Sequence, residues 1–248
     1  LLLGGNGSLA RTITQRFSAK GITVHSVIRD PKQASHLKAL GASPIVQSVE
    51  DSSVSDFVKL IKNVKPDVVI WSAGAGGGSA SAARLKRVDT DGHIKVMDAV
   101  AQAAEEAGTT RRYITISSLE VRDEVNKPVP DWYDEDDRVY SKWAWPIFRP
   151  YFQARLASDK DLVEKNGQRR LEYTIVRPGW MSLQPGTGRI GAGKCNITGQ
   201  VSRDDVTSVL EVCMESSRTI GLAFDVASGN VPISEAVNKA EDSFKGYH

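Results

Sequence analysis

Short apolar segments alternate with helix-like segments along almost the whole of this 248-residue chain. Residues 67–74, "DVVIWSAG", are rich in β-branched side chains, which is typical of buried strands in parallel sheets. Residues 8–20 place apolar side chains at helical spacing and stop at Gly21, a common helix end. Strands that alternate with helices indicate βαβ units, and therefore a parallel sheet with helices on both faces.

The alternation predicts an α/β fold, a Rossmann-type doubly wound parallel sheet, as a single domain over residues 1–248. We expect small additional elements on the substrate side near the C-terminal end. A closing helix is predicted over residues 233–244. The expected strands are residues 1–3, 22–28, 43–49, 67–74, 111–118, 171–179 and 219–228.

Residues 121–150 interrupt this rhythm with prolines, acidic clusters and aromatic residues that show no steady periodicity. A long irregular insertion in a compact fold is usually functional or mobile. One interpretation is a substrate lid or pocket wall for a flat molecule, and the other is a satellite core or an interface. The aromatic residues concerned are Trp132, Tyr133, Trp143, Trp145 and Phe148.

Composition excludes several classes of protein. A net charge of +2 gives no concentrated basic field, so we expect no nucleic-acid partner and no membrane surface. No apolar run approaches the roughly 18 residues of a membrane span. The two cysteines, Cys195 and Cys213, indicate isolated thiols in a reducing compartment and predict a cytoplasmic location. We expect a monomer or a homodimer. The acidic run 134–137 lacks companion His or Cys residues, so it predicts a solvated loop and no metal site.

The first strand is followed by the glycine-rich turn "GGNGSLA" and a helix. Gly4 suits a tight turn, Gly7 allows a phosphate to approach the backbone, and Ala10 is small enough for close helix packing. Free N–H groups at the helix start would face an anion. The turn predicts a dinucleotide site, although a turn without a ligand remains the alternative.

The segment "VIRDPK" places Arg29 directly after the second strand, with Lys32 close behind. An arginine at this position accommodates the 2′-phosphate of NADP, whereas NAD-binding proteins favour an acidic residue. We therefore expect NADP(H), with NAD(H) less favoured. The alternative is a solvated arginine beside Asp30, which would cap the following helix.

Several segments together resemble a known family. In order and spacing, "GGNGSLA", "VIRDP", "DVVIWSAGAGG", "VDTDGHIKVMDA", "YITISSL", "YFQARLASDKDL" and "LEYTIVRPG" are similar to the atypical short-chain dehydrogenase/reductases. The chain resembles most the NmrA-like, NAD(P)-binding branch, which includes biliverdin reductase B-like enzymes and uncharacterised fungal members.

The resemblance implies a cofactor contact for each matched position. The pyrophosphate would contact Gly4, Asn6, Gly7, Ser8 and Leu9, and the 2′-phosphate would contact Arg29. The adenine would lie beside Ser48 and Val49, and the adenine-side ribose beside Ser72, Ala73 and Gly74. The nicotinamide would be bordered by Pro178 and Gly179. Many relatives carry Asp where this chain has Ser48, so the adenine contact is altered.

The resemblance also implies catalytic positions. The family's Tyr-x-x-x-Lys motif, whose tyrosine donates a proton as hydride arrives, is matched by Tyr151 and Arg155, four residues apart on one helix face. Arginine keeps the charge and can still contact the cofactor, but it cannot give up a proton. Ser117 and Ser118 are the candidates for the serine that holds the substrate oxygen, and Asp89 replaces a family asparagine.

Three functions follow from these expectations. The first is an NADPH-dependent oxidoreductase that transfers hydride to a small carbonyl or conjugated substrate. The second is a non-catalytic, NADP(H)-sensing regulator of the NmrA-like type. The third is a non-redox isomerase or dehydratase on the same fold.

Overall fold

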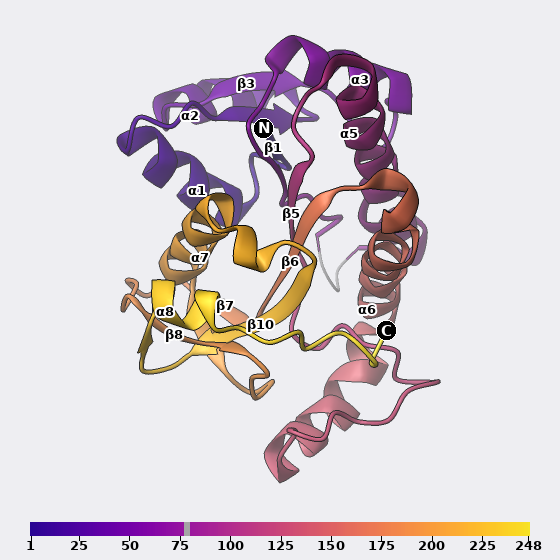
Figure 1. Ribbon diagram of the computed structural model, residues 1–248, viewed down its shortest axis with the longest axis vertical. Helices are drawn as coiled ribbons and strands as arrows, with labels where there is room; N and C mark the ends of the chain where they lie inside the picture. The colour runs from indigo at the N-terminus through magenta and orange to yellow at the C-terminus, as the bar shows by residue number, and fades with distance from the viewer. Residues whose placement is uncertain (77–79) are drawn as a thin grey trace.

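A nine-stranded, mostly parallel sheet organises the computed structural model, which describes residues 1–76 and 80–248 (Figure 1). The strands of this sheet, in chain order, are β1 (Leu2–Leu3), β2 (His25–Ile28), β3 (Ser43–Val46), β4 (Val69–Trp71), β5 (Arg112–Ile116), β6 (Glu172–Pro178), β8 (Arg189–Gly193), β10 (Leu222–Ser228) and β11 (Val231–Pro232). Their order across the sheet is β11-β8-β10-β6-β5-β4-β1-β2-β3. All neighbours from β3 to β10 are parallel, and β8 and β11 add antiparallel pairings at one edge.

Helices cover both faces of the sheet (Figure 1). One face carries α1 (Ser8–Ala19), α2 (Ala34–Ala39), α7 (Arg203–Glu215) and α8 (Ile233–Asn238), and the other carries α3 (Val54–Val64), α5 (His93–Ala107) and α6 (Glu135–Arg169). Successive strand residues point to opposite faces, so Leu2 packs in the first core and Leu3 in the second. The predicted doubly wound α/β fold is therefore confirmed.

Smaller elements complete the fold. A two-stranded parallel sheet of β7 (Trp180–Ser182) and β9 (Gln200–Ser202) lies near the C-terminal end, among the small elements expected there. Short helical turns are η1 (Pro31–Gln33), α4 (Ala82–Leu85), the π-helical η3 (Lys86–Gly92) and η4 (Ser217–Thr219). Residues 77–79, which include the last glycine of the segment "DVVIWSAGAGG", lie outside the described residues.

The prediction that residues 121–150 are irregular is wrong for their second half. Residues 121–134 contain no helix or strand, but residues 135–150 form the first half of α6, a helix of 35 residues that includes Pro146 and Pro150. This half of α6 extends beyond the sheet at the bottom of Figure 1. Its Trp145 packs in a small cluster with Val121, whereas later turns of α6 join the main core, so no single apolar stripe runs along the helix.

The acidic run starts α6 and is not a fully solvated loop. Asp134 and Asp137 form a capping box in which each side chain accepts the other's backbone N–H. Asp137 is fully buried and also accepts the N–H of Ile197 at 2.8 Å. The two cysteines carry free thiols and are buried, as expected. Within residues 1–76 and 80–248, no helix has the length and apolarity needed to cross a membrane.

Candidate active site

The strand order reverses between β1 and β4, and a cleft of about 780 Å³ opens there. β1 pairs in parallel with β2 on one side and β4 on the other. Open α/β sheets bind ligands at such a switch point, outside the carboxyl ends of the strands. The cleft brings together most of the residues predicted from the sequence, namely Gly4, Asn6, Gly7, Ser8, Leu9, Arg29, Ser48, Val49, Ser72, Ala73, Gly74, Ser117, Tyr151 and Arg155.

The turn after β1 has the backbone that a phosphate cradle requires. Gly4 has φ of +77°, and a Cβ at this position would lie 2.5 Å from the Cα of Ala73. Only glycine fits there, because the backbone of the β4 loop passes so close. Gly7 donates its N–H to the Gly4 carbonyl at 2.9 Å and is the N-cap of α1, where no side chain caps the helix. The start of α1 therefore fits a diphosphate.

Three arginines surround one carboxylate at the β2 end of the cleft. Glu50 lies 3.2 Å from Arg29, 3.5 Å from Arg84 and 3.4 Å from Arg87. Arg29, Arg84 and Glu50 all line the cleft, so a net positive charge faces it. Asp30 accepts a backbone N–H and caps the start of η1, as the alternative interpretation of "VIRDPK" predicts. Arg29 nevertheless lines the cleft.

Only Arg29 of these three arginines is identified from the sequence. Arg84 and Arg87 follow β4 and are three residues apart, which places both on one side of a helical turn. This spacing is the sequence signal from which Arg84 and Arg87 could have been identified as neighbours on a helix. Their contact with Glu50 depends on the fold, since Glu50 belongs to a different loop.

Hydrogen bonds fix the loop after β3. The Ser48 hydroxyl accepts the N–H of Glu50 at 3.2 Å and of Asp51 at 3.3 Å. Lys95 on α5 donates to the carbonyl oxygens of Val49 and Glu50, at 3.0 and 3.3 Å. Ser48 therefore shapes the wall of the cleft.

Tyr151 and Arg155 lie one turn apart on α6, and both line the cleft. The Arg155 guanidinium is buried, donates to the Ile116 carbonyl, and lies 3.6 Å from Oδ1 of Asp89. Burial lowers the pKa of Arg155, but the neighbouring Tyr151, Asp89 and Asp159 outweigh it and raise that pKa.

The two departures from the family pattern, Arg155 and Asp89, thus form one buried ion pair. Asp89 is fully buried in the π-helical turn η3. Its Oδ2 accepts the Ala75 N–H at 2.9 Å, which ties the loop after β4 to η3.

The two candidate serines have different environments. The Ser117 hydroxyl donates to Oδ2 of Asp159, a fully buried carboxyl whose pKa is raised, chiefly by burial. Ser118 is only half-buried and lines a second cavity. Asp159 is not identified from the sequence, although its spacing of four from Arg155 places both residues on one face of α6.

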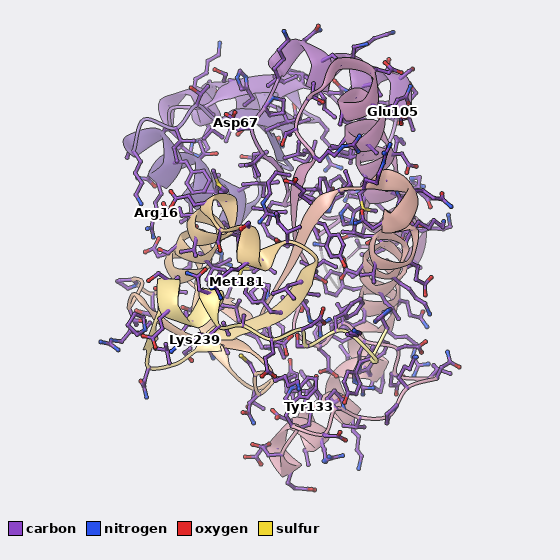
Figure 2. The ribbon with its side chains drawn as sticks, viewed as in Figure 1. Arg16, Asp67, Glu105, Tyr133, Met181 and Lys239 are labelled. Atoms are coloured by element: carbon purple, nitrogen blue, oxygen red, sulfur yellow. The ribbon has the colours of Figure 1, made fainter. Side chains whose placement is uncertain are left out.

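The second cavity, of about 270 Å³, adjoins the cleft and shares three lining residues with it, Ser117, Tyr151 and Met181. Met181 is labelled near the middle of the molecule in Figure 2. Pro178 and Gly179, predicted to border the nicotinamide, line this second cavity and not the cleft. Its aromatic lining, apart from Tyr151, is Tyr140, Phe148, Phe152 and Trp180.

Of the five aromatic residues singled out in the sequence, only Phe148 lines this cavity. Trp145 is 2% exposed and packs on Phe152 at a ring distance of 5.1 Å. Tyr133 is buried beside the start of α6, in the lower part of Figure 2. Trp143 is 54% exposed and packs edge-on to Phe148 at 6.2 Å. The region therefore supplies both a satellite core and one wall of the cavity.

Comparisons with known proteins agree with this geometry. A UPF0659 protein of Schizosaccharomyces pombe is 31% identical over 237 residues, which cover 96% of this chain and 92% of the relative. YhfK of Bacillus subtilis, named as an uncharacterized sugar epimerase, is 30% identical over 239 residues, with 96% and 98% covered. The structure of the oxidoreductase ylbE from Lactococcus lactis gives a TM-score of 0.73 at 21% identity, covering 96% and 95%. A family model described as NAD(P)H-binding matches residues 4–216. The resemblance inferred from the motifs is thus confirmed, and the chain belongs to the NAD(P)H-binding family.

Proposed function

We propose that the protein is an NADPH-dependent oxidoreductase that transfers hydride to a small carbonyl or conjugated substrate, with aromatic substrates favoured. One observation carries the proposal: the cleft at the switch point and the aromatic-lined cavity meet at Ser117, Tyr151 and Met181. A nicotinamide at that end of the cleft would face a substrate in the cavity. Bound NADPH would supply the hydride.

The cleft residues would bind and select the cofactor. The start of α1 and the Gly4 turn would hold the diphosphate. Arg29 and Arg84 would bind the 2′-phosphate in place of Glu50, because a phosphate offers more charge and more acceptor oxygens than one carboxylate. This exchange is the reason we propose NADP(H) over NAD(H). The two free, buried thiols support a cytoplasmic location.

The residues where the two cavities meet would handle the proton. Tyr151 would donate its hydroxyl proton to the substrate oxygen. Ser118 is better placed than Ser117 to donate a second hydrogen bond to that oxygen, because the Ser117 proton is engaged with Asp159. Arg155, held by Asp89, would keep a positive charge beside Tyr151.

Calorimetry with NADPH and NADH tests the cofactor assignment. We expect NADPH to bind more tightly, and Arg29→Ala and Arg84→Ala each to reduce the NADPH preference by about tenfold or more. Arg218→Ala, an exposed arginine on η4, is the matched control and should change nothing. Equal affinity for both cofactors in the unmodified protein would refute the assignment.

NADPH consumption against quinones, flavins and aromatic ketones tests the reaction. We expect turnover on at least one class and a loss of about 100-fold or more in Tyr151→Phe. Tight NADPH binding with no turnover on any of them, unchanged by Tyr151→Phe, would favour the NADP(H)-sensing regulator.

A non-redox epimerase, isomerase or dehydratase is the second candidate, because YhfK, at 30% identity, is named as a sugar epimerase. Such an enzyme returns the hydride to its product and leaves the cofactor unchanged. Substrate conversion with tightly retained cofactor and no net NADPH oxidation would favour it. The aromatic lining of the second cavity favours the oxidoreductase, since it suits a flat molecule.

A further inference from the structure

One acidic residue lines the second cavity among mainly apolar and aromatic side chains. Glu120 is the only acidic residue among the described residues that line it, and it is 4% exposed. The cavity is otherwise lined by groups such as Leu119, Phe148 and Ile197. A charged side chain is costly in such surroundings, so its retention there points to a ligand contact or a proton transfer.

The loop that carries Glu120 is anchored on both sides. Arg177 of β6 donates Nη1 to the Val121 carbonyl at 2.7 Å and Nη2 to the Leu119 carbonyl at 2.8 Å. Its Nε donates to Asp225 of β10 at 2.7 Å, within an ion pair that is almost completely buried. The backbone of Glu120 is therefore fixed to the sheet, which preorganises its carboxyl for recognition.

Each oxygen of the carboxyl accepts one hydrogen bond from the protein. Oε1 accepts the Ser141 hydroxyl at 2.5 Å, and Oε2 accepts the Tyr133 hydroxyl at 3.3 Å. Arg122 donates to Ser141 at 2.9 Å, so its charge reaches Glu120 through that hydroxyl. A carboxylate has about four acceptor positions, so these two bonds leave capacity for a ligand.

The groups around Glu120 leave it poised between its two protonation states. Burial raises the pKa of Glu120 to about 7, although hydrogen bonds from Ser141 and Tyr133 and the charges of Arg122 and Arg177 lower it.

The Tyr140 hydroxyl of α6 completes these surroundings. Burial, and after it the charge of Glu120, raises the pKa of Tyr140, while a hydrogen bond from Trp180 lowers that pKa. Tyr140 also lines the cavity, so the field of the Glu120 carboxylate reaches the space that a substrate would occupy.

We propose that Glu120 is a specificity-determining residue that accepts a hydrogen bond from a hydroxyl or N–H group of a flat, aromatic substrate bound in the second cavity. The inference rests on the proposed function only in calling this ligand the substrate. Glu120 would then distinguish aromatic carbonyl compounds that carry a hydrogen-bond donor from compounds of similar shape that carry none.

The pH dependence of binding has a definite sign. A ligand that donates to the carboxylate binds the ionised form, so its affinity should rise as the pH passes upward through about 7. Binding near pH 7 should release part of a proton. A ligand that only accepts hydrogen bonds would bind the protonated acid and show the opposite trend.

The probes are 4-(hydroxymethyl)benzaldehyde and 4-(methoxymethyl)benzaldehyde, which differ in one donor and do not titrate between pH 5 and 9. Binding to the full chain is measured by calorimetry with and without saturating NADP⁺. At pH 8 we expect the hydroxymethyl probe to bind about tenfold more tightly, since a hydrogen bond to a carboxylate is worth about that much. Below pH 6 the difference should shrink.

Two variants separate the contact from a general effect of the loop. Glu120→Gln should lose the pH dependence and most of the preference, because an uncharged amide oxygen accepts a weaker hydrogen bond than a carboxylate. Glu124→Gln, on the same loop and paired with Arg149 at the surface, is the matched control and should keep both. A second measurement needs no variant: the carbon-13 NMR signal of Glu120 should titrate near pH 7 and at lower pH with the hydroxymethyl probe bound.

Equal binding of the two probes at pH 8, no binding of either, or a preference that is undiminished in Glu120→Gln would overturn the inference. These results are distinguishable from failure of the proposed function. NADPH oxidation without probe discrimination would overturn the role of Glu120 alone. Absence of NADPH oxidation with any carbonyl compound would overturn the oxidoreductase and leave the binding result standing.

Discussion

The buried pair of Arg155 and Asp89 predicts that Asp89→Asn destabilises the protein when Arg155 is present and stabilises it when Arg155 is replaced. At 3.6 Å, two opposite unit charges attract by about 5 kcal/mol at an effective dielectric constant of 20. Asp89→Asn keeps an acceptor for the Ala75 N–H but removes the charge. Because Asp159 still faces Arg155, we expect a loss of about 3 kcal/mol in the free energy of unfolding, at the lower end for a broken buried pair.

Arg155→Met should cost more, because it leaves both Asp89 and Asp159 buried without their cation. In that background, Asp89→Asn removes an unpaired buried charge and should raise the free energy of unfolding. The hydrogen bond from Arg155 to Ile116 is lost in both Met variants, so it cancels in this comparison. Urea denaturation at pH 7 of the unmodified protein, Asp89→Asn, Arg155→Met and the double variant measures these changes in the free energy of unfolding. The reasoning fails if Asp89→Asn destabilises both backgrounds equally.

Three further predictions follow from burial, protonation and backbone geometry. Trp145→Ala should lower the free energy of unfolding by about 3–5 kcal/mol, whereas Trp143→Ala, at a 54% exposed position, should cost less than about 1 kcal/mol; similar losses in thermal denaturation would contradict this. Since burial raises the pKa of Glu120 from 4.5 to about 7, the folded protein holds an extra proton between these values. The contribution of Glu120 to stability should then fall by about 3 kcal/mol as the pH rises through that window, a slope that Glu120→Gln should remove in urea denaturation from pH 4.5 to 8. Gly4→Ala, at φ of +77° and with a Cβ contact of 2.5 Å, should destabilise the fold by at least about 1–3 kcal/mol and abolish NADPH binding in calorimetry, whereas a variant with normal affinity would refute the assigned turn.

The order of elements and most of the cleft could be predicted because both depend on local patterns. Strand and helix periodicities indicate the parallel sheet, and in such a sheet the ends of the strands meet at one edge. Gly4, Arg29 and Ser117 each follow a strand, so their gathering in one cleft follows from the fold class. Tyr151 and Arg155 share a helix face by spacing alone.

Contacts between distant segments could not be predicted in this way. Glu50 meets Arg84 and Arg87 because the loop after β3 comes together with the helical turns α4 and η3 after β4, and no local pattern encodes that contact. The helical conformation of residues 135–150 was hidden by Pro146 and Pro150, which normally interrupt a helix. Here the capping box at the start of α6 and its packing against residues outside the helix outweigh that local preference.

The anchoring of the Glu120 loop by Arg177 has a consequence for how this protein can diversify. One side of the second cavity is tied to the sheet, so a change at Arg177 would disturb the core itself. The facing side comes from the part of α6 that extends beyond the sheet, where Tyr140 and Phe148 lie. Residues on that half of the helix can therefore be exchanged, and the shape of the cavity changed, without disturbing the core, while the backbone that carries Glu120 stays in place.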